Sequence, residues 1–320
     1  MNRDNRTWLW VGAVAVVLLI AVVFPFIAGP YFLQFATDAL MFAILASSWN
    51  IIGGYTGYPS FGNVVFFGLG AYTTGILMTK AGMPFVVGLV GSAVVCVVFA
   101  VLVGLPVLRL RGHYFAIATL GIAEAMREVV INLDITEGNT GMVLPLIRNP
   151  EMFYYFMLGT LILTLVVTFW FTRRRLGYGL VAIREDEDAA ASAGVDTTRY
   201  KIIAFALSGL FAGIAGGIHA YKITFIEPGP VFDVGVTVEM IVMAVFGGVG
   251  TVIGPTVGAF LLQIISELLS NYIVLLHATF FGLVVIFAII FTPRGLVDML
   301  SGRKPFGLGY FLENVREHRI

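Results

Sequence analysis

A short charged stretch lies between two long apolar runs, and its residue types suit binding to another protein. Residues 173–199 read RRRLGYGLVAIREDEDAAASAGVDTTR. Asp186, Glu187 and Asp188 precede three alanines, and Gly194 follows them. Acidic residues stabilise the first turn of a helix and glycine commonly ends one, so the pattern predicts a short helix. Such a helix suits docking in a groove on a partner protein. A solvated loop is the alternative, because most charged runs simply face water.

A second charged group interrupts the apolar run 113–133. A spacing of three places Glu124 and Arg127 on one helical face, whereas Glu128, directly next to Arg127, is expected to point elsewhere. A charge at the centre of a bilayer costs roughly 2.5–3.5 kcal/mol on insertion scales, so these residues should pair and face protein or water. They are candidates for a polar translocation path, and a fixed ion pair between helices is an equally good interpretation.

Three further polar residues lie in apolar surroundings. Asn50 and Asn63 flank the glycine-rich break Gly53–Pro59, and Glu239 lies in a later apolar run. Broken helices expose polar backbone groups at transport routes, which makes Asn50, Asn63 and Glu239 path candidates. Hydrogen bonding between helices is the plainer interpretation.

Signatures of catalysis and metal binding are missing from the sequence. The four histidines lack metal-ligand spacing, and there is no HExxH motif or GxxxxGK[ST] phosphate loop. The sequence also offers no nucleophile–base pair. We therefore expect neither an enzyme nor a metal site, and no cofactor in this chain.

Composition places these residues in a membrane protein. Of the 320 residues, 59% are hydrophobic and only 12% are charged, about half the share in soluble domains. The 19 basic and 19 acidic residues cancel, so no basic field favours nucleic acid as a partner. The single cysteine, Cys96, excludes a disulfide framework within the chain. The sequence predicts a multi-pass membrane protein surrounded by lipid.

The uncharged runs predict an all-α polytopic fold with about ten membrane segments. A crossing needs about 20 apolar residues and must be helical, because lipid offers the backbone no hydrogen-bond partners. The interval between Asp38 and Lys80 holds two helices, and the glycines within Val234–Asn271 break that stretch into two crossings or a re-entrant pair. The other predicted segments are Trp8–Ala28, Pro84–Leu108, His113–Leu133, Met152–Thr172, Ile202–Tyr221 and Leu268–Pro293.

The distribution of Lys and Arg predicts the orientation of the chain. With both termini in the cytoplasm, 15 of the 19 basic residues lie on the cytoplasmic side, as the positive-inside rule requires. The whole chain, 1–320, then forms one transmembrane domain. Residues 173–199 are a cytoplasmic loop within it, and residues 294–320 are a cytoplasmic tail.

Several stretches resemble one protein family, in the same order along the chain. Asp188-Ala189-Ala190, three further residues and Gly194 resemble the cytoplasmic coupling motif of ATP-binding-cassette (ABC) importer permeases, with Asp where Glu is usual. GYPSFGNVVFFGLGAY, RLRGHYFAIATLGIAEAMR, GGVGTVIGPTVGAF and TPRGL look like segments of the branched-chain amino-acid permeases. The second and last of these favour the M-type subunit over the H-type.

The resemblance implies a non-enzymatic permease subunit that carries branched-chain amino acids across the bacterial inner membrane. Its implied partners are a homologous H-type permease, two cytoplasmic ATPase subunits that bind ATP and Mg, and an external substrate-binding protein. The residues implied to couple transport to the ATPases are Arg184, Glu185, Asp186, Glu187, Asp188, Ala189, Ala190 and Gly194. Permeases for urea, short amides or sugars, an ATP-independent secondary transporter, and a structural membrane subunit remain as alternatives.

Overall fold

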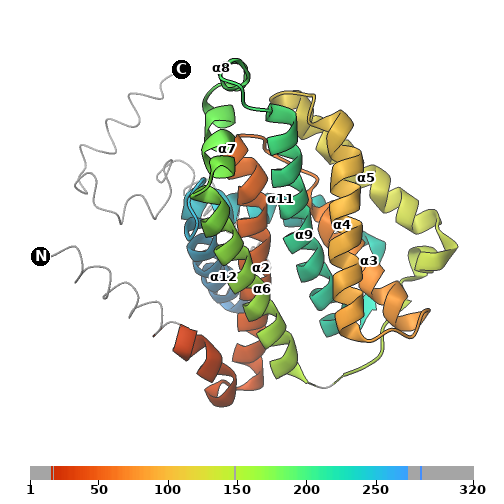
Figure 1. The fold of residues 1–320 in the computed structure, drawn as a ribbon. Helices are drawn as coiled ribbons and strands as arrows, with labels where there is room; N and C mark the ends of the chain where they lie inside the picture. Colours follow the sequence, from red (N-terminus) through yellow and green to blue (C-terminus); the bar gives the residue numbers. More distant parts are fainter. Residues whose placement is uncertain (1–15, 17, 148, 273–281, 283–320) are drawn as a thin grey trace, which may run out of the picture.

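Long apolar helices form the body of the protein. The computed structural model describes residues 16, 18–147, 149–272 and 282. Within these residues, five stretches are long and apolar enough to cross a membrane. Four are single helices, α2 (Pro30–Thr56), α4 (Phe85–Val107), α6 (Pro150–Thr172) and α9 (Thr197–Ile223), which run lengthwise through the molecule (Figure 1). The fifth stretch, Pro228–Gly247, holds two shorter helices.

The shorter elements connect and flank these helices. The described part of the first predicted segment contains a helix at Leu18–Ile27. Of the last predicted segment, Leu268–Pro293, the structure describes only residues 268–272 and 282. The tail 294–320 lies outside the described residues. The other helices are α3 (Asn63–Thr79), α5 (His113–Asn132), α7 (Arg175–Glu185), α8 (Glu187–Ser192), α10 (Pro228–Val231), α11 (Val234–Gly247) and α12 (Gly254–Tyr272), with 3-10 turns η1 (Asp134–Thr136) and η2 (Gly138–Thr140).

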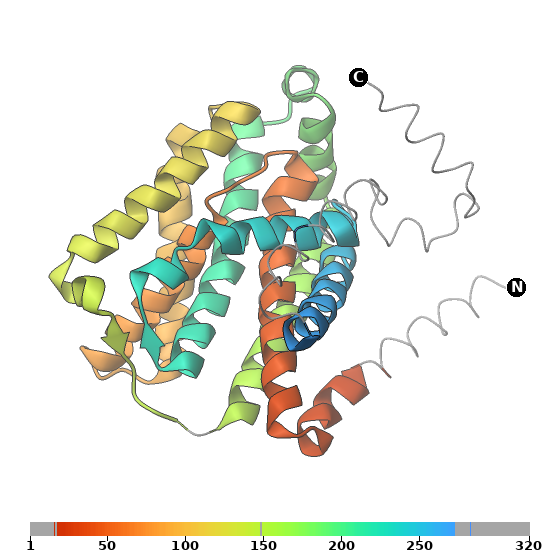
Figure 2. The ribbon, with the colours of Figure 1, turned by 180° about the vertical axis from the view of Figure 1, so that it is seen from behind.

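A short sheet marks the end of the molecule away from α8 (Figure 2). Strands β1 (Met142–Val143) and β2 (Phe225–Ile226) pair antiparallel, with Met142 opposite Ile226. They tie the connection between α5 and α6 to the end of α9.

Helix α9 is central, and glycines allow its close packing against α3 and α4. A Cβ atom on Gly70 of α3 would lie 2.0 Å from the carbonyl oxygen of Gly213, and one on Gly213 would lie 2.4 Å from Cys96 Sγ of α4. The sequence places Gly209, Gly213 and Gly217 on one helical stripe. That stripe therefore serves close helix packing within this chain.

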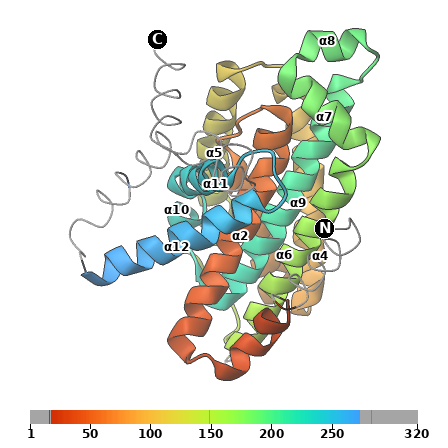
Figure 3. The same cartoon turned by 90° about the vertical axis from the view of Figure 1, so that its left-hand side faces the viewer.

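The predicted break between residues 234 and 271 is confirmed. Helix α11 ends at Gly247 and α12 begins at Gly254, and Gly248 and Gly250 between them have positive φ angles of 128° and 76°. The two helices pack closely, because a Cβ atom on Gly258 would lie 2.0 Å from the carbonyl oxygen of Met243. Helix α11 lies across α2 rather than along it (Figures 2 and 3).

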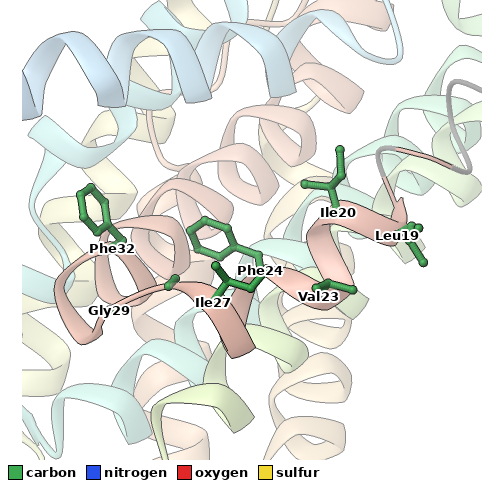
Figure 4. Close-up of a pocket in the computed structure, with 8 residues that line it drawn as sticks. Leu19, Ile20, Val23, Phe24, Ile27, Gly29 and Phe32 are labelled. Atoms are coloured by element: carbon green, nitrogen blue, oxygen red, sulfur yellow. The ribbon is translucent and has the colours of Figure 1, made fainter.

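The perimeter of the described structure is strongly apolar. On α5, Tyr114 and Ile117 are 75% and 66% exposed, whereas Phe115 is fully buried. The helix before α2 forms an open groove of about 630 Å³ lined by apolar side chains that include Phe24 and Phe32 (Figure 4). Apolar surface of this extent suits contact with lipid or another membrane subunit.

Candidate coupling site

The charged stretch 173–199 folds as two helices, of which the second is the predicted short one. The Asp186 carboxylate accepts hydrogen bonds from the backbone N–H groups of Asp188 and Ala189, both at 2.9 Å, and so caps α8. Gly194 has a φ angle of 87°, and Val195 N–H bonds back to the Ala190 carbonyl at 3.0 Å. This left-handed glycine ends the helix as the sequence predicted. Helix α8 stands out at one end of the molecule (Figure 3).

Arg184 and Glu185 are not part of this docking helix, because they form the last turn of α7. The Arg184 guanidinium points inward and donates to the Gly54 carbonyl at the end of α2, at 3.2 Å. It also reaches the turn between α11 and α12, since a Cβ atom on Gly250 would lie 2.7 Å from Arg184 Nη1. Glu185 pairs with Arg184 at 3.1 Å and is 71% exposed. Arg184 therefore connects α7 to α2 and to the break of the α11–α12 pair.

A buried lysine anchors α8 to the helices behind it. Lys201, in the first turns of α9, is only 3% exposed. Its ammonium group donates to Glu187 Oε1 at 2.6 Å, to the Leu108 carbonyl at 2.8 Å and to the Tyr58 hydroxyl at 3.0 Å. The Tyr58 hydroxyl in turn donates to the other oxygen of Glu187. All three donors of the ammonium group are thus satisfied, as a buried charge requires.

We call Tyr58, Glu187 and Lys201 the anchor cluster. It joins the connection between α2 and α3, helix α8 and helix α9, and through the Leu108 carbonyl it reaches the end of α4. Burial opposes ionisation of Glu187, but the hydrogen bonds from Lys201 and Tyr58 and the charges of Lys201 and Arg111 outweigh it. The pKa of Glu187 is therefore held below its usual range.

The outer side of α8 carries a separate, exposed ion pair. The Arg111 guanidinium donates two hydrogen bonds to the Asp188 carboxylate, at 2.8 Å and 2.9 Å. The Asp188 side chain is 75% exposed. These hydrogen bonds and the charge of Arg111 lower the pKa of the Asp188 carboxyl. Ala189 is also exposed, whereas Ala190 is buried against the body. One face of α8 is therefore held inward, and the face with Asp188 and Ala189 is open to a partner.

Sequence reasoning missed three residues of this site, namely Tyr58, Arg111 and Lys201. A signal was present for Lys201, because it begins an apolar run and a cation there has to be paired. The positive-inside rule accounts equally well for a lysine at the cytoplasmic end of a span, so the sequence does not single out Lys201 as a paired residue. Tyr58 and Arg111 carried no comparable signal.

The charged triplet on α5 pairs, but differently from the prediction. Arg127 contacts Glu124 at 3.5 Å and Glu128 at 3.6 Å, so the expectation that Glu128 points elsewhere is wrong. The long arginine stem and forked guanidinium reach both carboxylates. The three side chains are 38–59% exposed, on a surface of the chain rather than in its interior.

The remaining path candidates lie apart from that triplet. Asn50 binds the turn after α11, accepting from Gly250 N–H at 2.8 Å and donating to the Thr251 carbonyl at 2.9 Å. Asn63 donates to the Ser208 hydroxyl at 2.8 Å and so joins α3 to α9. Both are buried and make hydrogen bonds between segments of this chain. Glu239 is half-buried on α11 and has no hydrogen-bond or ion-pair partner among the described residues.

The helical body and its apolar surface fit a polytopic membrane protein, and the sequence matches a family of transport permeases. Residues 31–291 match the family described as branched-chain amino acid transport system, permease component, and the chain belongs to this family. It is a multi-pass permease subunit of an ABC importer and lies in the inner membrane.

Curated relatives agree with this placement. The chain is 31% identical to the high-affinity branched-chain amino acid transport system permease protein LivM of Salmonella typhimurium, over 88% of the chain and 73% of the relative. It is 30% identical to LivM of Escherichia coli over the same shares. The autoinducer 2 import system permease protein LsrC of Yersinia pestis is 28% identical over 61% of the chain and 60% of its own length.

Proposed function

We propose that this chain carries branched-chain amino acids and that α8 receives the movement of a separate ATPase subunit. The anchor cluster is the observation that supports this proposal. A helix that only faced solvent would need no buried lysine behind it, whereas a helix that transmits force needs a stiff attachment. Lys201 supplies that attachment with three hydrogen bonds of 2.6–3.0 Å.

The movement of α8 has two routes into the membrane body. The anchor cluster leads to α9 and to the end of α4, and Arg184 leads to α2 and the α11–α12 turn. ATP and Mg act on the partner subunits. Their closure displaces α8, and the membrane helices change between inward-open and outward-open arrangements. Coupling requires that the ATPases contact α8 differently in the two states.

The proposed assembly contains this chain, an H-type permease, two ATPase subunits and an external substrate-binding protein. We propose about ten membrane segments, with both termini and the loop 173–199 in the cytoplasm. The stretch Pro228–Gly247 is long enough to cross only when α10 is counted with the 14 residues of α11. The course of α11 across α2 supports a re-entrant pair over two crossings. The exposed triplet on α5 and Glu239 stay proposed path residues.

The docking proposal is tested by leucine-stimulated ATP hydrolysis in the reconstituted complex. Asp188→Arg places a second cation beside Arg111, and Gly194→Pro cannot adopt the φ angle of 87° that ends α8. We expect both variants to lose stimulation at least about tenfold and to co-purify with less ATPase. Glu151→Arg, on an exposed residue at the start of α6, is the matched charge-reversal control and should retain stimulation. Unchanged stimulation in Asp188→Arg and Gly194→Pro would refute docking at α8.

The same preparation separates the alternative functions. Leucine uptake into vesicles without ATP would indicate a secondary transporter. Uptake of urea or acetamide in place of leucine would indicate an amide permease of the same family.

A further inference from the structure

A second cavity differs from the apolar groove of Figure 4 in the polarity of its walls. It has a volume of about 570 Å³, within the range of small-molecule sites. Helices α2, α3, α9, α10, α11 and α12 contribute to its walls. Its α2 residues lie between Tyr31 and Phe42, in the half of α2 away from Arg184 and α8. The cavity is therefore distinct from the coupling site.

Two helices present polar residues to this cavity at a helical spacing. Gln34 and Asp38 lie four residues apart on α2, and Gln263 and Glu267 lie four residues apart on α12. A spacing of four places each pair on one helical face. Polar side chains in membrane helices are costly and usually serve a function, so two such pairs lining one cavity call for a ligand or water.

Several of these groups lack hydrogen-bond partners within the protein. Neither the Gln34 nor the Gln263 amide has one among the described residues. His219, which also lines the cavity, packs its ring against Phe67 at 5.3 Å, and its buried Nδ1 atom likewise has no partner within the described part of the chain. The buried Nδ1 atom carries the cost of an unpaired polar group, whereas the exposed Gln34 and half-buried Gln263 amides are free to bind a polar ligand in the cavity.

The charges of the cavity favour a ligand with a cationic group. The Asp38 carboxylate is paired with the Lys222 ammonium group. Glu267 accepts a hydrogen bond from the Tyr31 hydroxyl, which is neutral, and has no cationic partner among the described residues. Among the described residues, the cavity wall thus carries one more carboxylate than cationic partners.

The rest of the wall is apolar and aromatic. Met41 and Phe67 are buried there, and Phe35, Phe42 and Val236 complete the apolar part. Aromatic rings pack against an apolar side chain, and their faces attract an ammonium group. A ligand that satisfies the whole wall carries an ammonium group at one end and an apolar side chain at the other.

We propose that this cavity binds a small zwitterion with an apolar side chain, with its ammonium group on Glu267 and its side chain against Phe35 and Phe42. The amides of Gln34 and Gln263 are placed to donate to its carboxylate. This inference rests on the proposed function and sharpens it, because urea and simple amides carry no ammonium group. It also places a substrate-binding site inside the permease subunit itself.

The test measures equilibrium binding of radiolabelled leucine to the purified full chain in detergent, with unlabelled competitors. Leucinamide keeps the ammonium group and lacks the carboxylate, 4-methylpentanoate keeps the carboxylate and lacks the ammonium group, and acetamide lacks both. We expect leucine and leucinamide to compete, and 4-methylpentanoate and acetamide to fail at the same concentrations. Glu267→Gln should weaken leucine binding roughly tenfold or more, the loss typical of one charge-assisted hydrogen bond.

Two further variants keep the test decisive. Gln263→Met retains the side-chain length without the amide and should weaken leucine binding about threefold to tenfold. It supplies the result if Glu267→Gln does not fold. Glu151→Gln neutralises an exposed carboxylate that lines neither cavity and should bind leucine normally.

Failure of the cavity proposal and failure of the proposed function give different results. Unchanged leucine affinity in the folded cavity variants, competition by acetamide equal to that by leucinamide, or no leucine binding to the chain would overturn the cavity proposal. Leucine uptake by cells that carry the complete transporter is measured in parallel. If the cavity variants take up leucine as well as the wild type does, the proposed function stands and only the cavity proposal fails. If the wild type shows no ATP-dependent leucine uptake, the proposed function itself is overturned.

Discussion

Replacing Lys201 with methionine should destabilise the protein and uncouple it from its ATPases. The substitution keeps most of the apolar stem and removes an ammonium group that makes three hydrogen bonds in a position only 3% exposed. It leaves the Glu187 carboxylate, 14% exposed, with the Tyr58 hydroxyl and with Arg111 Nε at 3.8 Å. Removing one partner of a buried ion pair typically costs about 3–5 kcal/mol.

The expected loss is about 2–3 kcal/mol, at or below the lower limit of that range, because Glu187 keeps one strong donor and some contact with water. The double variant Lys201→Met/Glu187→Gln removes both charges. We expect it to be more stable than the sum of the two single losses predicts, by about 1–2 kcal/mol, since neither charge is left unpaired.

The measurement is the free energy of unfolding of the purified chain in mixed micelles, followed by leucine-stimulated ATP hydrolysis in the complex. Lys80→Met is the control, because it breaks an ion pair with Glu137 whose side chains are 38% and 44% exposed and which lies outside the anchor cluster. Exposed pairs contribute little to stability. The reasoning on the anchor cluster is wrong if Lys201→Met loses no more stability than Lys80→Met, or if the double variant equals the sum of its parts.

Three other predictions concern packing, the broken helix pair and pH. Gly70→Ala places a Cβ atom 2.0 Å from a backbone oxygen and should lower the free energy of unfolding by more than about 2 kcal/mol. The control is Gly159→Ala, whose Cβ atom would have nothing within 4 Å and which should be neutral or stabilising by up to about 1 kcal/mol. Asn50→Leu leaves the Gly250 N–H without its acceptor and should cost about 1–3 kcal/mol in the same assay; no change would show that the turn holds without it. Because the pKa of Glu187 is lowered on folding, its contribution is complete above about pH 4.3 and is lost as the pH falls through its lowered value, so the stability difference between wild type and Glu187→Gln should shrink in acid.

Local patterns predicted most of the helices. Runs of about 20 uncharged residues correspond to α4, α6 and α9 to within a few residues, because the length of a crossing and the absence of charge are local properties. The glycines after residue 247 predicted the break between α11 and α12, since glycine tolerates a positive φ angle because it has no Cβ atom. Asp186 and Gly194 predicted the bounds of α8 for the same reason.

Contacts between distant residues were beyond the reach of those patterns. The resemblance implied Arg184 and Glu185 as coupling residues together with those of α8, and the structure places them on α7, because helix α8 starts only after its Asp186 cap. The contact of Arg127 with both neighbouring acids depends on the reach of a flexible side chain, which the helical spacing rule does not describe.

The sequence alone determined that this is a helical membrane protein with a short charged helix, since composition, run length and capping residues act locally. Only the tertiary structure decided that Lys201 meets Tyr58, 143 residues away, and that polar residues of α2 and α12 line one cavity. Such contacts between residues distant in the sequence follow from the packing of whole helices, and no local pattern specifies which helix faces pack together.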